Sequence, residues 1–163
     1  MHHFTLQRCL VGLSFILSMM MPQVHAEPPK PGSLAPEFTL IALNKTPVSL
    51  SSLRAKGHVM LIFWETQCVY CFAHIKEFNA LQKKYQGKLT IAGINFLGEY
   101  PREIQEYATD NQVEYLLLAD RLKNIDVAEA YQVIGSPTIV LIAPDGKILS
   151  YGYQIPDVSQ WIK

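Results

Sequence analysis

The cysteine pair Cys68 and Cys71 constrains the fold of this chain more than any other sequence feature. It follows a continuous apolar run, Val59 to Trp64, and it opens a segment with helical spacing, Cys71 to Tyr85. A short, uninterrupted apolar run is typical of a buried strand. The sequence therefore predicts a strand that ends just before the pair and a helix that begins at it.

Two thiols at the start of a helix indicate thiol chemistry. Free backbone N–H groups and the helix dipole stabilise an anion there, and a thiolate is such an anion. Cys68, nearest the helix start, is expected to be the exposed attacking sulfur. Cys71, one turn inside, is expected to resolve the mixed disulfide. Because so short a loop constrains little of the unfolded chain, a purely structural bridge is disfavoured.

Other uses of the pair depend on its neighbours. Covalent haem needs a histidine directly after the second cysteine, where Phe72 stands, and structural zinc needs a second cysteine pair, which is missing. His74 could complete a soft-metal site with Cys68 and Cys71, since the three are spaced three residues apart. A copper-binding assembly factor is therefore the alternative. The simpler interpretation of His74 is a partly exposed helix residue, with no metal bound.

The first residues of the chain differ from the rest. An apolar run of 13 residues, Cys9 to Met21, is followed by the small-residue signal Val24 to Ala26. This layout is typical of a secretory leader, and the run is shorter than the roughly 20 residues of a membrane-spanning helix. We expect a cleavable signal peptide at 1–26, a proline-rich lead-in at 27–36 and one folded domain at 37–163. The chain would be soluble after cleavage and membrane-anchored if uncleaved.

Charge and size limit the partners. The 163 residues suit one domain, and 14 basic residues balance 14 acidic ones. Loss of the leader would remove one basic residue, Arg8, and leave the balance near neutral. Such a balance argues against a nucleic-acid partner. Export would place the chain where disulfides persist.

Strand and helix patterns alternate beyond the leader, which indicates a mixed sheet with flanking helices. Asp145-Gly146 is the strongest hairpin signal, and Asp157 is expected to cap a last short helix. The predicted strands are Glu37 to Leu43, Val48 to Leu50, Val59 to Trp64, Leu89 to Phe96, Tyr115 to Ala119, Thr138 to Ala143 and Ile148 to Tyr153. The predicted helices are Ser51 to Arg54, Cys71 to Tyr85, Pro101 to Asn111 and Ile125 to Tyr131.

Taken together, these landmarks resemble the thioredoxin superfamily, and more closely its exported TlpA/ResA-like branch. The resemblance runs from Pro31 to Tyr153 and implies an α/β fold of three layers: a thioredoxin-like central mixed β-sheet flanked by helices, with an N-terminal β-hairpin extension. The landmarks are Ala35-Pro36-Glu37-Phe38, Phe63-Trp64, the cysteine pair, Gly93-Ile94-Asn95, Gly135-Ser136-Pro137-Thr138 and Asp145-Gly146-Lys147.

The resemblance implies a thiol-disulfide oxidoreductase that exchanges its dithiol with protein substrates and needs no cofactor. It implies exported protein thiols or disulfides as partners, a role as reductant in cytochrome c maturation, and electrons from a membrane-embedded thiol reductase. The location would be the periplasm or another compartment outside the cytoplasm. Pro137 would follow a cis bond, and Tyr70, Ser136 and Pro137 would contact substrate.

Four positions depart from the pattern of the family. Gln67 and Tyr70 stand where Trp and Pro are usual around the cysteines, so the redox potential cannot be transferred. Ile62 replaces the buried aspartate of thioredoxins, and His74 replaces the glutamate common in the TlpA/ResA-like branch. A histidine at that position could perform the same proton transfer nearer neutral pH.

The nearest rival among enzymes is a peroxiredoxin, which would need Pro and Thr or Ser where this chain has Leu61 and Glu65. That interpretation is disfavoured. Glu65 is expected to be a solvated charge, and Trp64 a packing residue beside the site.

Overall fold

The computed structural model describes residues 28–163. The predicted signal peptide, residues 1–26, lies outside the described residues and stays a prediction. Among the helices of the described part, none is both long and apolar enough to cross a membrane.

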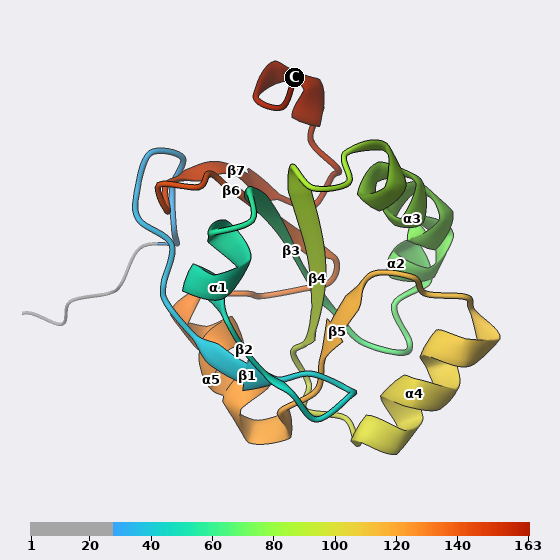
Figure 1. Cartoon of the computed structure of the whole chain (residues 1–163). Helices are drawn as coiled ribbons and strands as arrows, with labels where there is room; N and C mark the ends of the chain where they lie inside the picture. The colour runs from blue at the N-terminus through green and yellow to red at the C-terminus, as the bar shows by residue number, and fades with distance from the viewer. Residues whose placement is uncertain (1–27) are drawn as a thin grey trace, which may run out of the picture.

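A five-stranded mixed sheet forms the centre of the molecule (Figure 1). Its strand order is β5-β4-β3-β6-β7. The strands β3 (His58–Trp64), β4 (Leu89–Asn95) and β5 (Leu116–Leu118) are parallel to one another, whereas β6 (Thr138–Ile142) pairs antiparallel with β3 and β7 (Ile148–Gly152) pairs antiparallel with β6. The carboxyl ends of β3, β4 and β5 share one edge of the sheet. The start of β6 joins them there, because Phe63 pairs with Thr138.

Helices cover both faces of the sheet and complete the three predicted layers (Figure 1). One face carries α1 (Leu50–Arg54) and α5 (Arg121–Ala130). The other carries α2 (Val69–Ala73), α3 (Ile75–Lys84), α4 (Pro101–Asp110) and the 3-10 turn η1 (Val158–Gln160). The thioredoxin-like α/β architecture is therefore confirmed.

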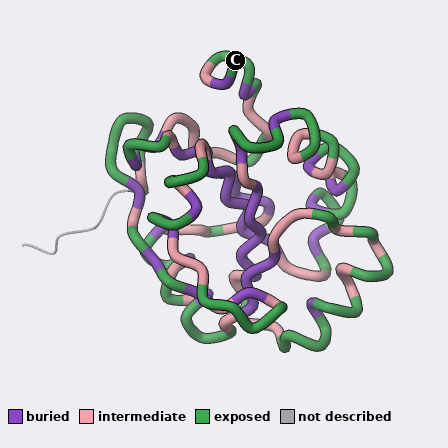
Figure 2. Tube along the Cα trace, in the orientation of Figure 1, coloured by how far each residue is buried: buried purple, intermediate pink, exposed green. Residues whose placement is uncertain are grey.

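The apolar run of β3 divides its side chains between two cores. Leu61 and Phe63 pack on the side of α1 and α5, whereas Ile62 and Trp64 pack on the side of α2, α3 and α4. Because side chains alternate across a strand, burial on both faces requires an unbroken apolar sequence. Figure 2 shows the resulting buried centre, with exposed residues concentrated on the surrounding helices and loops.

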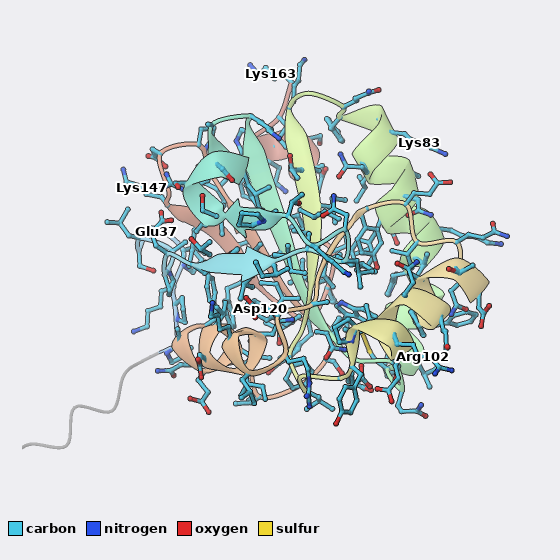
Figure 3. The ribbon with its side chains drawn as sticks, turned by 60° about the horizontal axis from the view of Figure 1, so that its bottom comes forward. Glu37, Lys83, Arg102, Asp120, Lys147 and Lys163 are labelled. Atoms are coloured by element: carbon cyan, nitrogen blue, oxygen red, sulfur yellow. A yellow bond between two sulfur atoms is a disulfide. The ribbon has the colours of Figure 1, made fainter. Side chains whose placement is uncertain are left out.

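The N-terminal hairpin is present as predicted, formed by β1 (Thr39–Ile41) and β2 (Pro47–Ser49). The lead-in before it is tied to the other end of the chain. The N–H of Gly32 donates to the carbonyl of Ile148 at 2.8 Å, and the N–H of Ala35 donates to that of Gly146 at 2.9 Å. Charged side chains lie at the periphery; Figure 3 shows Lys83 and Arg102 directed away from α3 and α4.

Two predicted helices differ from the structure. The segment 71–85 is not one helix but two, because the chain tightens into a three-residue turn at His74. Ile75 and Phe78 remain on the buried side, so the apolar spacing continues across the break. Helix α5 begins at Arg121, ahead of the predicted start. Its Asn124 is polar but buried, because the side chain is hydrogen-bonded inside the core.

The end of the chain carries a single 3-10 turn in place of a full helix. Asp157 caps this turn as predicted, accepting from the N–H of Ser159 at 3.1 Å.

Candidate active site

Cys68 and Cys71 are joined by a disulfide where β3 passes into α2, with their Cα atoms 5.2 Å apart. Cys68 is the N-cap of α2, and its Sγ accepts the backbone N–H of Cys71 at 3.0 Å. The short turn after β3 brings Cys68 into this position, since its N–H donates to the carbonyl of Glu65 at 3.2 Å. The predicted strand-to-helix junction is therefore confirmed.

Cys68 is more buried than the sequence suggested. Cys68 is 6% exposed and Cys71 4%, so exposure of the whole residue does not distinguish them, and the prediction of an exposed Cys68 is wrong. The reason is packing: both sulfurs belong to the core between the sheet and α2 to α4. A cavity of about 260 Å³ nevertheless reaches Cys68. Its lining is Thr66, Gln67, Cys68, Val69, Phe72 and Tyr107, and Cys71 is not part of it.

Exposed apolar side chains occur at this opening, which Val69 and Phe72 line, and near it in the sequence. Val69, Tyr70 and Phe72 project from α2 and are mostly exposed, and Ile134 is exposed just before the Ser136–Pro137 loop. Exposed apolar side chains gathered around a reactive centre are typical of a binding surface. The exposure of Tyr70 matches the sequence prediction.

The Ser136–Pro137 peptide bond is cis, as the resemblance implied. Pro137 is buried, and the Oγ1 of Thr138 donates to the carbonyl of Gly135 at 2.7 Å, which fixes the loop ahead of β6. The Oγ of Ser136 donates to the Oε1 of Glu65 at 3.3 Å. This bond holds the loop against the segment that leads to Cys68.

Two carboxylates fix the segment between β3 and Cys68. The Oε2 of Glu65 accepts the N–H of Gln67 at 2.6 Å. The carboxylate of Glu99 accepts the N–H of Thr66 at 3.1 Å and its hydroxyl at 2.6 Å, and the amide of Asn95 also donates to it. Glu65 is thus half-buried and hydrogen-bonded. Glu65 was predicted to be a solvated charge; it is only partly exposed, because the N–H of Gln67 and the hydroxyl of Ser136 donate to its carboxylate.

Glu99 was missed in the sequence. The available signal was Asn95, the polar end of an otherwise apolar strand: the Oδ1 of Asn95 accepts the N–H of Glu99 at 2.9 Å and thereby positions its carboxylate.

Tyr107 of α4 closes the cavity beside Cys68. Its ring packs against Trp64 with centroids 5.0 Å apart, in agreement with the predicted packing role of Trp64. Its hydroxyl is buried and makes no hydrogen bond within the described part of the chain. Burial, and then the negative charges of Glu65 and Glu99, raise the pKa of Tyr107 above its usual value.

His74 lies at the junction of α2 and α3, where its Nδ1 is 3.1 Å from the Oε2 of Glu77 and its side chain is 40% exposed. Within residues 28–163, no three His, Cys, Asp or Glu side chains are grouped so that they could hold a metal ion. In this structure Cys68 and Cys71 are bonded to each other, so the copper alternative concerns the reduced protein and stays a hypothesis.

The fold, the disulfide at the strand-to-helix junction and relatives named thiol-disulfide oxidoreductases together define a thioredoxin-fold thiol-disulfide oxidoreductase. More particularly, the chain belongs to the AhpC/TSA family, whose model matches residues 31–151. Peroxiredoxin-type chemistry is not indicated by this match alone, because Leu61 and Glu65 replace the proline and hydroxyl residues that such a site needs.

Curated relatives support this assignment. The chain is 34% identical over 123 residues to the thiol-disulfide oxidoreductase ResA of Bacillus subtilis, covering 72% of this chain and 64% of the relative. It is 29% identical over 119 residues to the thioredoxin-like protein YneN of the same species, covering 72% and 68%. The chain thus spans about two thirds of the length of these relatives.

Among solved structures, the thioredoxin domain of a thiol-disulfide oxidoreductase from Bacteroides vulgatus superposes with a TM-score of 0.75. The superposition covers 82% of this chain and 99% of that one at 23% identity, so it supports the fold.

Proposed function

We propose that this chain is an exported thiol-disulfide oxidoreductase whose dithiol reduces disulfides in protein substrates. The observation that carries the proposal is the disulfide between Cys68 and Cys71, reached by a cavity and held next to the loop of the cis bond before Pro137. The relatives named thiol-disulfide oxidoreductases support the same reaction class.

The exchange proceeds in two displacements. The Cys68 thiolate attacks one sulfur of the substrate disulfide, which forms a mixed disulfide and releases the other substrate sulfur as a thiolate that takes up a proton. Cys71 then loses its proton and attacks the Sγ of Cys68, which closes the protein disulfide and releases the second substrate sulfur. Two electrons pass from the protein to the substrate; of the two protons that the substrate thiols take up, Cys71 releases one and the solvent supplies the other, which replaces the proton that Cys68 lost on ionising.

Tyr70, Ser136 and Pro137 are the proposed substrate contacts. Ser136 and Pro137 lie just ahead of β6 and are held to the Cys68 turn through Glu65, and we propose that a substrate segment pairs with this backbone as an added strand. Tyr70, together with Val69 and Phe72, offers apolar contact area beside Cys68. We also propose His74 as a proton-transfer group. Its contact with Glu77 is compatible with this role but is not evidence for it.

Location and electron supply rest on the sequence and the relatives. The leader-like residues 1–26 support export to the periplasm or an equivalent compartment. There we propose that the chain keeps exported thiols reduced, as in cytochrome c maturation, with a membrane-embedded thiol reductase as electron donor.

Trapping of a mixed disulfide tests the reaction and the assignment of the two cysteines. Reduced Cys71→Ser, incubated with a disulfide-bonded peptide, should retain the peptide through Cys68, because the resolving sulfur is missing. Cys68→Ser should retain none. Mass spectrometry of the two variants reads the outcome, with a thermal melt of each to show that it is folded. Equal trapping by both would reverse the roles, and trapping by neither would refute the proposal.

A further inference from the structure

Glu65 connects the two segments that form the site. One carboxylate oxygen accepts the N–H of Gln67, the residue directly before Cys68, at 2.6 Å, and the other accepts the hydroxyl of Ser136 at 3.3 Å. Its backbone carbonyl accepts the N–H of Cys68 at 3.2 Å. A single residue thus fixes the approach to the attacking sulfur and ties it to the loop of the cis bond.

The half-buried carboxylate of Glu65 keeps its charge. Its hydrogen-bond partners, a backbone N–H and a hydroxyl, are neutral, so they orient the carboxylate without cancelling its charge. Glu99 places a second carboxylate on the same turn through Thr66. Tyr107 lines the cavity together with Cys68. After burial, the negative charges of Glu65 and Glu99 contribute to raising the pKa of its hydroxyl. These two carboxylates and this phenol are the titratable groups that we place around Cys68.

A negative charge near a thiol disfavours the thiolate. For a dithiol pair, stabilising the reduced form makes the protein a stronger oxidant, and destabilising it makes the protein a stronger reductant. The carboxylate of Glu65 opposes the stabilisation that the Cys71 N–H offers to Cys68. The charge of Glu65 therefore favours the disulfide form of the Cys68–Cys71 pair over the dithiol form.

We propose that Glu65 is a positioning residue that holds the Ser136 loop against the Cys68 turn and, through its charge, shifts the pair toward the disulfide, so that the reduced protein is a stronger reductant. This inference rests on the proposed function and supplies its direction. The two electrons leave the dithiol for a substrate disulfide, as in the exchange above, and Glu65 itself gains and loses no bond.

Equilibration with glutathione tests the inference. Glu65→Gln keeps one acceptor oxygen for the N–H of Gln67, and its NH2 group can donate to the Ser136 hydroxyl, but the charge is removed. We therefore expect the equilibrium constant for oxidation of the pair by glutathione disulfide to fall at least threefold. That change corresponds to about 14 mV, since tenfold is 29.6 mV for two electrons. The thiolate pKa of Cys68, measured in the Cys71→Ser background, should fall as well, which a purely structural role would not produce.

Three further variants sharpen the test. Glu65→Asp keeps the charge and should stay within twofold of the unmodified protein. Glu106→Gln removes an exposed charge on α4 that pairs with Arg102, and should leave the constant unchanged. Glu65→Ala, which needs no fitting side chain, should lower the constant at least threefold and decides the question if Glu65→Gln does not fold.

The outcomes separate this inference from the proposed function. An unmodified protein that does not exchange with glutathione would refute the function itself. An unmodified protein that exchanges, with the same constant in Glu65→Gln or Glu65→Ala, would overturn only the role of Glu65. An equal fall in Glu106→Gln would also overturn it, because net charge and not position would then be the cause.

Discussion

The backbone N–H of Cys71 lies 3.0 Å from the Sγ of Cys68 and donates to it from the first turn of α2. This donor belongs to the backbone of Cys71, the residue that resolves the mixed disulfide. The N–H of Cys71 is therefore also available to the Cys68 thiolate once the pair is reduced.

This contact predicts an acidified Cys68. A hydrogen bond to the charged form lowers a pKa, so the thiol of Cys68 should ionise below the free value of about 8.5 despite the opposing charge of Glu65. The ultraviolet absorbance of the thiolate in reduced Cys71→Ser, followed against pH, measures it. The reduced Cys68→Ser protein supplies the comparison, and an unshifted or raised value for Cys68 would contradict the assignment.

Buried Tyr131 and half-buried Tyr107 should respond differently to loss of the hydroxyl. The Tyr131 hydroxyl donates to the carbonyl of Pro36 at 2.8 Å, so Tyr131→Phe should cost about 1 kcal/mol of unfolding free energy. The Tyr107 hydroxyl has no such partner among the described residues, so Tyr107→Phe should cost nothing or stabilise by up to about 1 kcal/mol. Urea unfolding at pH 7 measures both. Equal losses would show that Tyr107 has a partner after all.

Gly93 should resist substitution because Trp64 and Leu117 approach its Cα closely. A Cβ there would lie 2.7 Å from the Cδ2 of Leu117 and 2.9 Å from the Nε1 of Trp64. Gly93→Ala should therefore cost about 1–3 kcal/mol and alter the tryptophan fluorescence. Gly152→Ala, where a Cβ meets nothing within 4 Å, is the matched control and should change stability by less than about 0.5 kcal/mol. Similar losses in both variants would argue against the close approach.

His74→Ala tests two hypotheses at once. Because His74 is the proposed proton-transfer group, we expect the pH profile of disulfide exchange to change shape in the variant, although the ring lies against Glu77 at the surface. An unchanged profile would contradict the proton-transfer role. Anaerobic copper titration of the reduced protein completes the experiment. Sub-micromolar copper binding that is lost in His74→Ala would support the copper alternative.

Most of the fold could be predicted because its signals are local. Apolar runs mark β3, β4 and β6, and Asp145-Gly146 marks the last hairpin. The position of the disulfide followed from the same signals, since the pair stands between a strand pattern and a helix pattern. The cis bond before Pro137 followed from the resemblance and not from the residues themselves.

The rest of the site depends on contacts between distant segments. Glu99 binds Thr66 across 33 residues, and Ser136 binds Glu65 across 71. No periodicity records such bonds, because they depend on how the loops at the sheet edge fold over one another. The sequence did not predict the break between α2 and α3 at His74 for another reason. Apolar spacing indicates which side chains are buried, and this spacing continues unchanged across one tight turn.

The redox potential of the unmodified pair tests the central claim most directly. Equilibration against glutathione buffers, read from the masses of the alkylated and disulfide forms, should show one two-electron couple. We predict a potential closer to that of thioredoxin, about −270 mV, than to that of the strong oxidant DsbA, about −120 mV. A potential near that of DsbA, or a cysteine pair that does not exchange with glutathione at all, would contradict the account of this chain as a reductant.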